Sequence, residues 1–460
     1  MERFALNHLK SWKHGPDRKP LIIRGARQVG KSYLARAFAR ESFEGIAEIN
    51  FERDPDIATL FASNDPARIV PLLELRLNRP IRPGRTLLFL DEIQATPSVI
   101  ASLRYFCEAM PDLHVVAAGS LLEFALSDLG SPMPVGRVEF LHLGPMQFEE
   151  FLRASGSERL ADFLAGFHAG DPVPPAIHEA CMAPFREFLV VGGMPAAVAA
   201  YLRSRSFRDA DEAKVSLLTT FRDDFGKYGG RVPRDRIGRL FARLPALVGQ
   251  RFKYVNVDRD QRSDELARAL DLLCQARVAY RVRHTAANGI PLEAETRDTV
   301  FRTLFLDSGL VASALGLTGL DVAQERDLLG ARSGSLCEQF VGQHLLYSQP
   351  FYRAPELHFW TREKAGSSAE VDYVIAEGPG IVPVEVKAGR TGTLKSLHLF
   401  LREKGRTFGI RLNADVPSVM DARTSLPDGR DIPFRLLSLP LYLVGQVRRL
   451  SRECLGLPAA

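Results

Sequence analysis

The sequence predicts an α/β protein whose N-terminal part is a parallel sheet covered by helices on both faces. Over the first 150 residues, short and continuously apolar segments alternate with helical segments, and a glycine-rich turn follows the first apolar segment. Strands that are buried on both faces are apolar throughout, which is typical of parallel sheets. With 460 residues, the chain is long enough for two to four domains.

Five strands are expected in this sheet, at residues 20–24, 47–51, 86–90, 114–118 and 138–143. Residues 148–230 have a helical pattern. Residues 233–310 follow the order helix, helix, strand, turn, strand, which is typical of a winged helix-turn-helix. Its expected elements are helices at 236–248 and 263–274 and strands at 278–282 and 299–306. A last unit has a helix at 334–347 and strands at 357–361, 370–375 and 381–386.

The composition is that of an ordinary globular protein, with 46% hydrophobic residues, 25% charged residues and a net charge of +5. This mild basicity permits contact with nucleic acid but does not by itself indicate it. Five widely spaced cysteines without a CxxC pair argue against a zinc site or a disulfide framework. The N-terminus lacks a signal-peptide core, and no apolar run is long enough for a membrane span. We therefore expect a cytoplasmic protein without a membrane partner.

The segment GARQVGKS matches the phosphate-binding pattern GxxxxGK[ST] at every fixed position, and it lies between an expected strand and an expected helix. Glycines let backbone N–H groups surround phosphate oxygens at a helix N-terminus. The lysine would reach the β- and γ-phosphates, and the serine would bind Mg²⁺. The sequence therefore predicts a site for ATP with Mg²⁺, formed by Gly25, Ala26, Arg27, Gln28, Val29, Gly30, Lys31 and Ser32.

The apolar segment 87–90 ends in two carboxylates, Asp91 and Glu92. Asp91 would hold Mg²⁺, and Glu92 would orient the water that attacks the γ-phosphate. A buried strand with an acidic, solvated end is the alternative, and the neighbouring phosphate-binding segment disfavours it. Ser120 follows the fourth strand, where it is either a sensor of the γ-phosphate or part of a plain turn.

The C-terminal unit places carboxylates and a lysine on two neighbouring strands. Alternate residues of a strand face the same side, so Glu370 and Asp372 share one face, as do Glu385 and Lys387. In a hairpin, Asp372 and Glu385 would converge on one Mg²⁺, and Lys387 would steady an attacking water. The alternatives are a strand pair with cross-strand ion pairs, or a similar domain that binds DNA or protein without cutting.

Basic side chains are frequent in the expected winged-helix segment. They are candidate phosphate contacts for DNA, or simply a solvated face of an arginine-rich chain. They are Arg231, Arg234, Arg236, Arg239, Arg243, Arg251, Lys253, Arg281 and Arg283.

Together these motifs resemble the AAA+ superfamily, specifically the AAA_14-type ATPases that carry a C-terminal DUF4143 region. The resemblance covers nearly the whole chain. Besides the two nucleotide motifs and the C-terminal carboxylates, it rests on residues 118–122 (AGSLL), 136–137 (GR), 143–151 (LGPMQFEEF), 192–195 (GGMP) and 305–310 (FLDSGL).

The resemblance implies four parts. They are an AAA+ P-loop ATPase core at 1–150, a helical region at 151–232, a winged-helix-like domain at 233–330, and an α/β domain similar to PD-(D/E)xK restriction endonucleases at 331–460. In the last part, Glu338 would join Asp372 and Glu385 as a metal ligand, and Mn²⁺ could replace Mg²⁺. Assembly into a homo-oligomer is compatible with the resemblance, and Arg137 is either an arginine finger or a structural residue.

The expected function is that of an ATP-driven switch that controls a nuclease-like domain acting on or binding nucleic acid. The main alternative is a signalling or scaffold ATPase whose C-terminal domain binds partners without cleavage. A third possibility is nucleotide binding without turnover, which depends on the role of Glu92.

Overall fold

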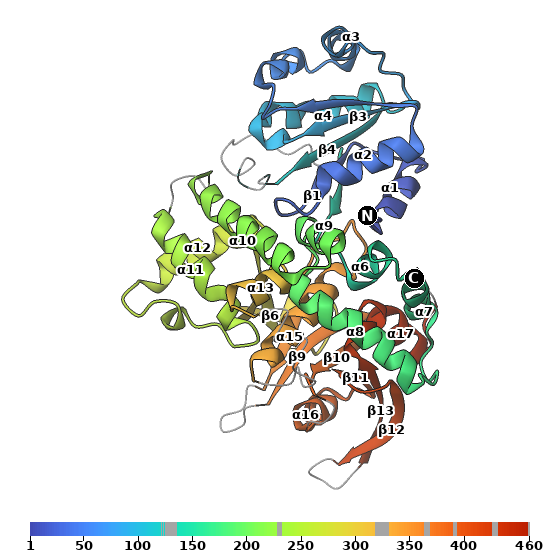
Figure 1. The fold of residues 1–460 in the computed structure, drawn as a ribbon, viewed down its shortest axis with the longest axis vertical. Coiled ribbons are helices and arrows are strands. Elements are labelled where there is room, and N and C mark those ends of the chain that lie inside the picture. The colour runs from blue at the N-terminus through green and yellow to red at the C-terminus, as the bar shows by residue number, and fades with distance from the viewer. Residues whose placement is uncertain are drawn as a thin grey trace.

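The structure is a computed structural model that describes residues 1–120, 122, 124, 136–227, 232–317, 331–362, 369–389, 393–425 and 431–458. One sheet lies at each end of an elongated molecule, and helices separate them (Figure 1). Within the described part of the chain, none of the helices combines the length and apolar character that crossing a membrane requires.

The N-terminal sheet has the strand order β2-β3-β4-β1-β5, and all its neighbouring strands are parallel. The strands are β1 Leu21–Arg24, β2 Gly45–Asn50, β3 Thr86–Asp91, β4 His114–Gly119 and β5 Glu139–His142. The helices of this part are α1 Ala5–Lys13, α2 Lys31–Ser42, α3 Pro66–Leu77 and α4 Pro97–Ala109. The expected parallel sheet is therefore confirmed.

Both faces of this sheet are buried, each in its own hydrophobic cluster. Ile22 and Leu88 belong to one cluster, whereas the adjacent Ile23 and Leu87 belong to the other. The second of these clusters continues without interruption through the helices into the C-terminal sheet, as far as Leu450. The N-terminal sheet thus shares a core with the rest of the molecule.

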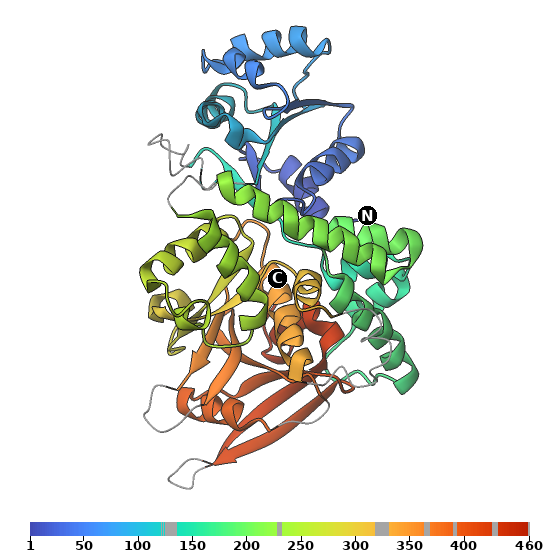
Figure 2. The same cartoon turned by 60° about the vertical axis from the view of Figure 1, so that its left-hand side comes forward.

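The helical region expected after residue 148 is present. It consists of α6 Phe148–Ala154, α7 Glu158–Gly166, α8 Pro175–Val191, α9 Pro195–Ser204 and α10 Phe207–Asp224. A capping box begins α6: the Glu150 side chain accepts a hydrogen bond from the Gln147 backbone N–H. The long helix α10 crosses the molecule between the two sheets (Figure 2).

The C-terminal sheet has eight strands in the order β12-β13-β11-β10-β9-β8-β6-β7. The strands are β6 Ala279–Thr285, β7 Thr296–Phe305, β8 His358–Thr361, β9 Glu370–Glu377, β10 Gly380–Val386, β11 Phe408–Asn413, β12 Ser418–Ser425 and β13 Asp431–Pro440. The accompanying helices are α11 Arg234–Arg243, α12 Ser263–Gln275, α13 Ser308–Ala314, α15 Ala331–Tyr347, α16 Lys395–Lys404 and α17 Val447–Cys454.

The two strands expected as a wing, β6 and β7, are part of this same sheet, because β6 pairs in parallel with β8. The sheet therefore crosses the boundary expected at residue 330. Strands β9 and β10 form the expected antiparallel hairpin, in which Val384 lies opposite Tyr373.

Candidate functional site

The phosphate-binding loop joins β1 to α2, and two of its glycines are required by the geometry. A Cβ atom on Gly25 would lie 2.2 Å from the carbonyl oxygen of Leu143, which directly follows β5. Gly30 caps α2 with a φ of +96°, a left-handed conformation that favours glycine. The first N–H groups of α2 have no partner within the helix, so this end of the helix is suited to phosphate oxygens.

Lys31 and Ser32 begin α2 and face different partners. Lys31 is buried, and its Nζ donates hydrogen bonds to the carbonyl oxygens of Gly25 and Ala26 at 3.1 and 2.8 Å. The Ser32 hydroxyl lies 2.9 and 3.0 Å from the two carboxylate oxygens of Asp91 at the end of β3. Burial raises the pKa of Asp91, while the Ser32 hydrogen bond opposes this shift. A hydroxyl beside a carboxylate offers the hard oxygen ligands that suit Mg²⁺.

Glu92 directly follows Asp91, with a left-handed φ of +52°. Its carboxylate accepts a hydrogen bond from Nε2 of Gln94 at 2.5 Å, a partner that sequence reasoning missed. The Ser120 hydroxyl, just beyond β4, is buried and has no hydrogen-bond partner within the described part of the chain. Since β4 pairs with β1, which leads into the phosphate-binding loop, this hydroxyl is close to where a nucleotide would lie.

Two arginines connect the phosphate-binding loop to the helical region. Arg27 forms ion pairs with Asp224 of α10 at 2.9 Å and with Glu52 at 3.3 Å. Arg3 is buried, donates to the carbonyl oxygen of Val29 at 2.8 Å, and pairs with Glu150 of α6 at 3.2 Å. The loop that would hold the phosphates is therefore tied to two different helices.

Three motifs that the nucleotide chemistry does not use meet around Asp307. The Asp307 carboxylate accepts hydrogen bonds from the backbone N–H groups of Gly193 at 2.7 Å and Leu310 at 3.1 Å. The Gln343 side chain of α15 donates a third at 3.3 Å. Gly193 in turn accepts a hydrogen bond from the Met146 N–H at 2.7 Å. These motifs fasten the end of the nucleotide-binding part to α9, α13 and α15.

The C-terminal carboxylates converge as expected, but around an arginine. Arg302 of β7 lies 3.4 Å from Glu338, 2.7 Å from Glu370 and 3.3 Å from Asp372. Burial opposes the charged form of Arg302, but these carboxylates outweigh burial and raise its pKa. Sequence reasoning missed Arg302, although a charged residue within the apolar strand 300–306 is a signal of a buried ion pair.

The remaining groups of this cluster also have partners. Lys387 donates to Glu385 at 2.7 Å, and the second oxygen of Asp372 accepts from the Val386 N–H at 2.8 Å. Burial, and after it the charge of Asp372, raises the pKa of Glu338 to about 8 and that of Glu385 to about 7.

No group of three or more acidic, histidine or cysteine side chains in the described ranges is arranged to hold a metal ion. The ligand set expected from Glu338, Asp372 and Glu385 for Mg²⁺ or Mn²⁺ is therefore not found. The physical reason is that the Arg302 guanidinium stands between Glu338 and Asp372 and supplies the positive charge that an ion would bring.

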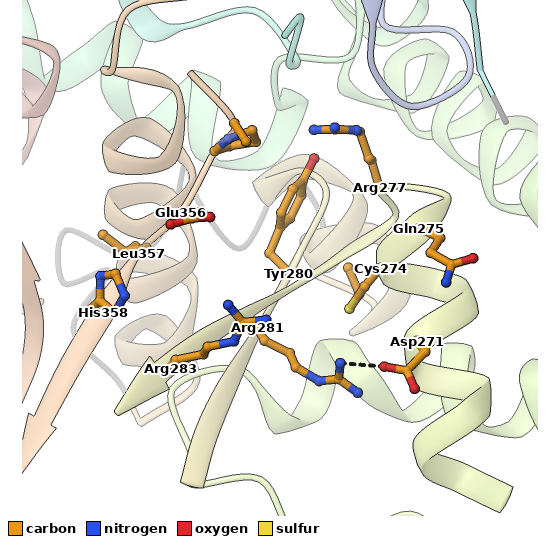
Figure 3. A pocket seen from close by; sticks show the side chains of 13 residues that line it. Asp271, Cys274, Gln275, Arg277, Tyr280, Arg281, Arg283, Glu356, Leu357 and His358 are labelled. Carbon is orange, nitrogen blue, oxygen red and sulfur yellow. Dashed lines mark hydrogen bonds and ion pairs between the residues drawn. The ribbon is translucent and has the colours of Figure 1, made fainter. Parts of the chain in front are cut away.

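A pocket of about 330 Å³ lies between the α12–β6 segment and residues 354–358 (Figure 3). Arg277, Arg281 and Arg283 line it, and Arg277 has a left-handed φ of +58°. Arg281 pairs with Asp271 of α12, whereas the ion pair of Arg283 with the exposed Asp298 is long, at 3.6 Å. The pocket therefore gathers two of the predicted basic residues together with Arg277, which was not predicted.

Other predicted basic residues lie apart from this pocket. Arg236 pairs with Glu265 and Arg239 with Asp258, both at the surface of the α11–α12 pair. Arg231 lies outside the described residues, as does Leu121 of the AGSLL motif. Arg137 pairs with Glu108, which also pairs with Arg104, so within this chain Arg137 forms an exposed surface ion pair.

Comparison with known protein families identifies three segments. Residues 17–152 match the model of an AAA domain. Residues 182–321 match a domain of unknown function (DUF8612), and residues 333–417 match another (DUF4143). No curated protein matches the chain.

Solved structures give only distant likenesses. The ORC2 protein of Aeropyrum pernix is 12% identical with a TM-score of 0.33, over 70% of this chain and 96% of that one. The RuvB Holliday junction branch migration motor of Thermotoga maritima is 15% identical with a TM-score of 0.27, over 60% and 87%. Both TM-scores lie well below 0.5. The match to an AAA domain thus covers the N-terminal third of the chain, which contains the phosphate-binding loop.

Proposed function

We propose that the chain hydrolyses ATP at the P-loop and uses the nucleotide state to change how its other parts are held. The observation that carries the proposal is the contact of Ser32 with Asp91, in which a hydroxyl and a carboxylate meet at the N-terminus of α2, with Glu92 next to Asp91 in the chain. When bound there, Mg²⁺ would neutralise charge on the phosphates, and Ser32 and Asp91 are the residues that would hold it.

The other side chains have separate roles in this proposal. Lys31 exchanges the carbonyl oxygens of Gly25 and Ala26 for the β- and γ-phosphates, where its charge stabilises the transferring group. Glu92 orients the attacking water and accepts its proton. The Ser120 hydroxyl, which has no partner among the described residues, donates a hydrogen bond to the γ-phosphate.

Substitution of Glu92 tests this assignment. In Glu92→Gln we expect nucleotide binding to persist and steady-state hydrolysis to fall by at least about 100-fold, because the amide cannot take a proton. Lys31→Ala should lose nucleotide binding itself, and Glu158→Gln, on the exposed start of α7, serves as the control. Equal rates of hydrolysis in wild type and Glu92→Gln would refute the role of Glu92 and favour nucleotide binding without turnover.

We further propose that the part beyond the ATPase domain binds nucleic acid, with the scaffold function as the alternative. The arginine-lined pocket supports this, because Arg277, Arg281 and Arg283 line one recess together with Asp271 and Glu356, and guanidinium groups bind phosphates well. The Arg283 side chain is more exposed than that of Arg281, at 43% against 21%, and its ion pair is the longer.

Binding of fluorescently labelled single- and double-stranded DNA by the full chain tests this proposal. Arg283→Ala should weaken binding and reduce the slope of log affinity against log salt by about 1. The control is Arg208→Ala on α10, whose side chain is 86% exposed and outside the pocket. If both variants bind DNA like the wild type, Arg283 and its pocket are not the binding site. If no DNA binds, the scaffold alternative is favoured and a search for a protein partner follows.

A further inference from the structure

The cluster around Arg302 joins charged groups from four separate elements. Arg302 belongs to β7, Glu338 to α15, and Glu370 and Asp372 to β9. Glu385, on β10, has one oxygen hydrogen-bonded to Lys387, and its other oxygen is buried without a hydrogen-bond partner among the residues that the structure describes. Three carboxylates thus contact one guanidinium, and the Glu385–Lys387 pair completes the cluster. Without Arg302, the buried carboxylates would need a bound cation to balance their charge.

The position of Arg302 is fixed by its backbone and by an aromatic ring. Its backbone pairs with Val282 of β6 on one side and forms a bridge with Arg251 on the other. Its guanidinium lies 5.2 Å from the centre of the Phe359 ring, and only 8% of the side chain is exposed. Arg302 is therefore part of the sheet interior.

The guanidinium also uses the oxygens that a metal ion would need. Mg²⁺ requires several convergent oxygens at about 2.0–2.1 Å. Here one oxygen each of Glu338, Glu370 and Asp372 already faces Arg302 at 2.7–3.4 Å, and the second oxygen of Asp372 accepts the Val386 N–H. An ion that entered the cluster would have to displace a buried cation and would be repelled by it.

We propose that the Arg302 guanidinium takes the place of a divalent cation in the C-terminal carboxylate cluster. The cluster then holds β7, α15 and β9 together as a metal-free ion-pair centre, and the domain binds its partner without metal-dependent cleavage. The proposal is independent of ATP turnover, since it concerns only residues distant from the phosphate-binding loop.

Manganese binding to the full, nucleotide-free chain tests the proposal, measured as loss of the free Mn²⁺ signal in electron paramagnetic resonance. All proteins carry Asp91→Asn, so that ions at the phosphate-binding loop do not contribute. The Asp91→Asn protein without further changes is the parent, and adding Asp372→Asn to it should not reduce its Mn²⁺ binding. Arg302→Gln should gain one equivalent, and adding Asp372→Asn should abolish that gain. Arg302→Lys keeps the charge and should bind none.

Two results would overturn the proposal. The first is Mn²⁺ binding by the parent that is lost on adding Asp372→Asn, which would show a metal site beside Arg302. The second is a folded Arg302→Gln protein that still binds no Mn²⁺, which would show that Arg302 is not what excludes the ion. If circular dichroism shows that Arg302→Gln is unfolded, the proposal is tested by comparing Mn²⁺ binding of the parent with that of the parent carrying Asp372→Asn. Binding unaffected by Asp372→Asn then counts in favour of the proposal, as does no binding.

Discussion

Replacing Asp307 with alanine should weaken the attachment of the nucleotide-binding part to the rest of the molecule. Asp307 is fully buried and accepts three hydrogen bonds, from Gly193, Leu310 and Gln343. Alanine would leave these three donors buried without an acceptor, at a cost of about 1–3 kcal/mol each. Burial raises the pKa of Asp307, so removing the carboxylate also relieves an unfavourable buried charge. We therefore expect the free energy of unfolding to fall by about 3 kcal/mol, which is the lower end of the range for three unpaired donors.

Urea unfolding followed by tryptophan fluorescence measures this loss in two places. The two tryptophans of the chain are both buried, Trp12 in α1 and Trp360 in β8, so Trp12→Phe and Trp360→Phe leave one reporter at each end. Because one hydrophobic cluster runs through both ends of the molecule, Asp307→Ala should lower the urea midpoint whether it is followed by Trp12 or by Trp360.

The matched control is Asp298→Ala, which removes an 88% exposed carboxylate from its long ion pair with Arg283. Such surface pairs contribute about 0–1 kcal/mol. If Asp307→Ala costs no more than Asp298→Ala, the carboxylate does not hold the parts together. A shift at only one tryptophan would mean that the two parts unfold separately, against the reasoning from the shared core.

Two further changes probe other buried contacts. His344 accepts the Phe148 N–H at 2.9 Å, so it must be neutral, and burial lowers its pKa to about 4. The unfolded chain, with a pKa of about 6.5, then binds more protons between these values, so stability should fall by about 3 kcal/mol as pH drops from 6.5 to 4. Across this pH range, the urea midpoint should change less with pH in His344→Gln than in the wild type. An equal change in both proteins would contradict a neutral, buried His344. Gly25→Ala would place a Cβ 2.2 Å from the Leu143 oxygen and should weaken binding of a fluorescent ATP analogue at least about tenfold, and unchanged affinity would show that the loop can shift freely.

The N-terminal sheet was predictable because its signals are local. Strands β1, β3 and β4 each contain a continuous apolar run, and the observed bounds of all five strands differ from the expected ones by no more than two residues at either end. The phosphate-binding pattern also carries its own context, a strand before it and a helix after it. Parallel pairing followed from burial of both faces, which periodicity alone indicates.

The contacts that organise the C-terminal part are not local, and this is why the sequence did not reveal them. Arg302 and Asp372 are 70 residues apart, and they meet only because β6 pairs with β8 across the expected domain boundary. The order of helices and strands in residues 233–310 is the same for a separate winged helix and for a hairpin that extends a neighbouring sheet. Only the pairing partner of β6 distinguishes the two, and a period of two residues does not identify a partner.

One short segment connects both functional regions of the molecule. Strand β7 places Arg302 in the C-terminal cluster, and five residues later Asp307 holds Gly193, to which the nucleotide-binding part is bonded through Met146. From the other side, Arg27 in the phosphate-binding loop reaches α10 through Asp224. If the loop rearranges when it binds phosphate, the change acts on α10 through that ion pair. Helix α10 in turn packs against α9 and α13, which flank the Asp307 contacts. These contacts make Asp224 and Asp307 the pair to test with a double-mutant cycle on ATP affinity. If the nucleotide state reaches the C-terminal sheet, the two substitutions should show a non-zero interaction energy.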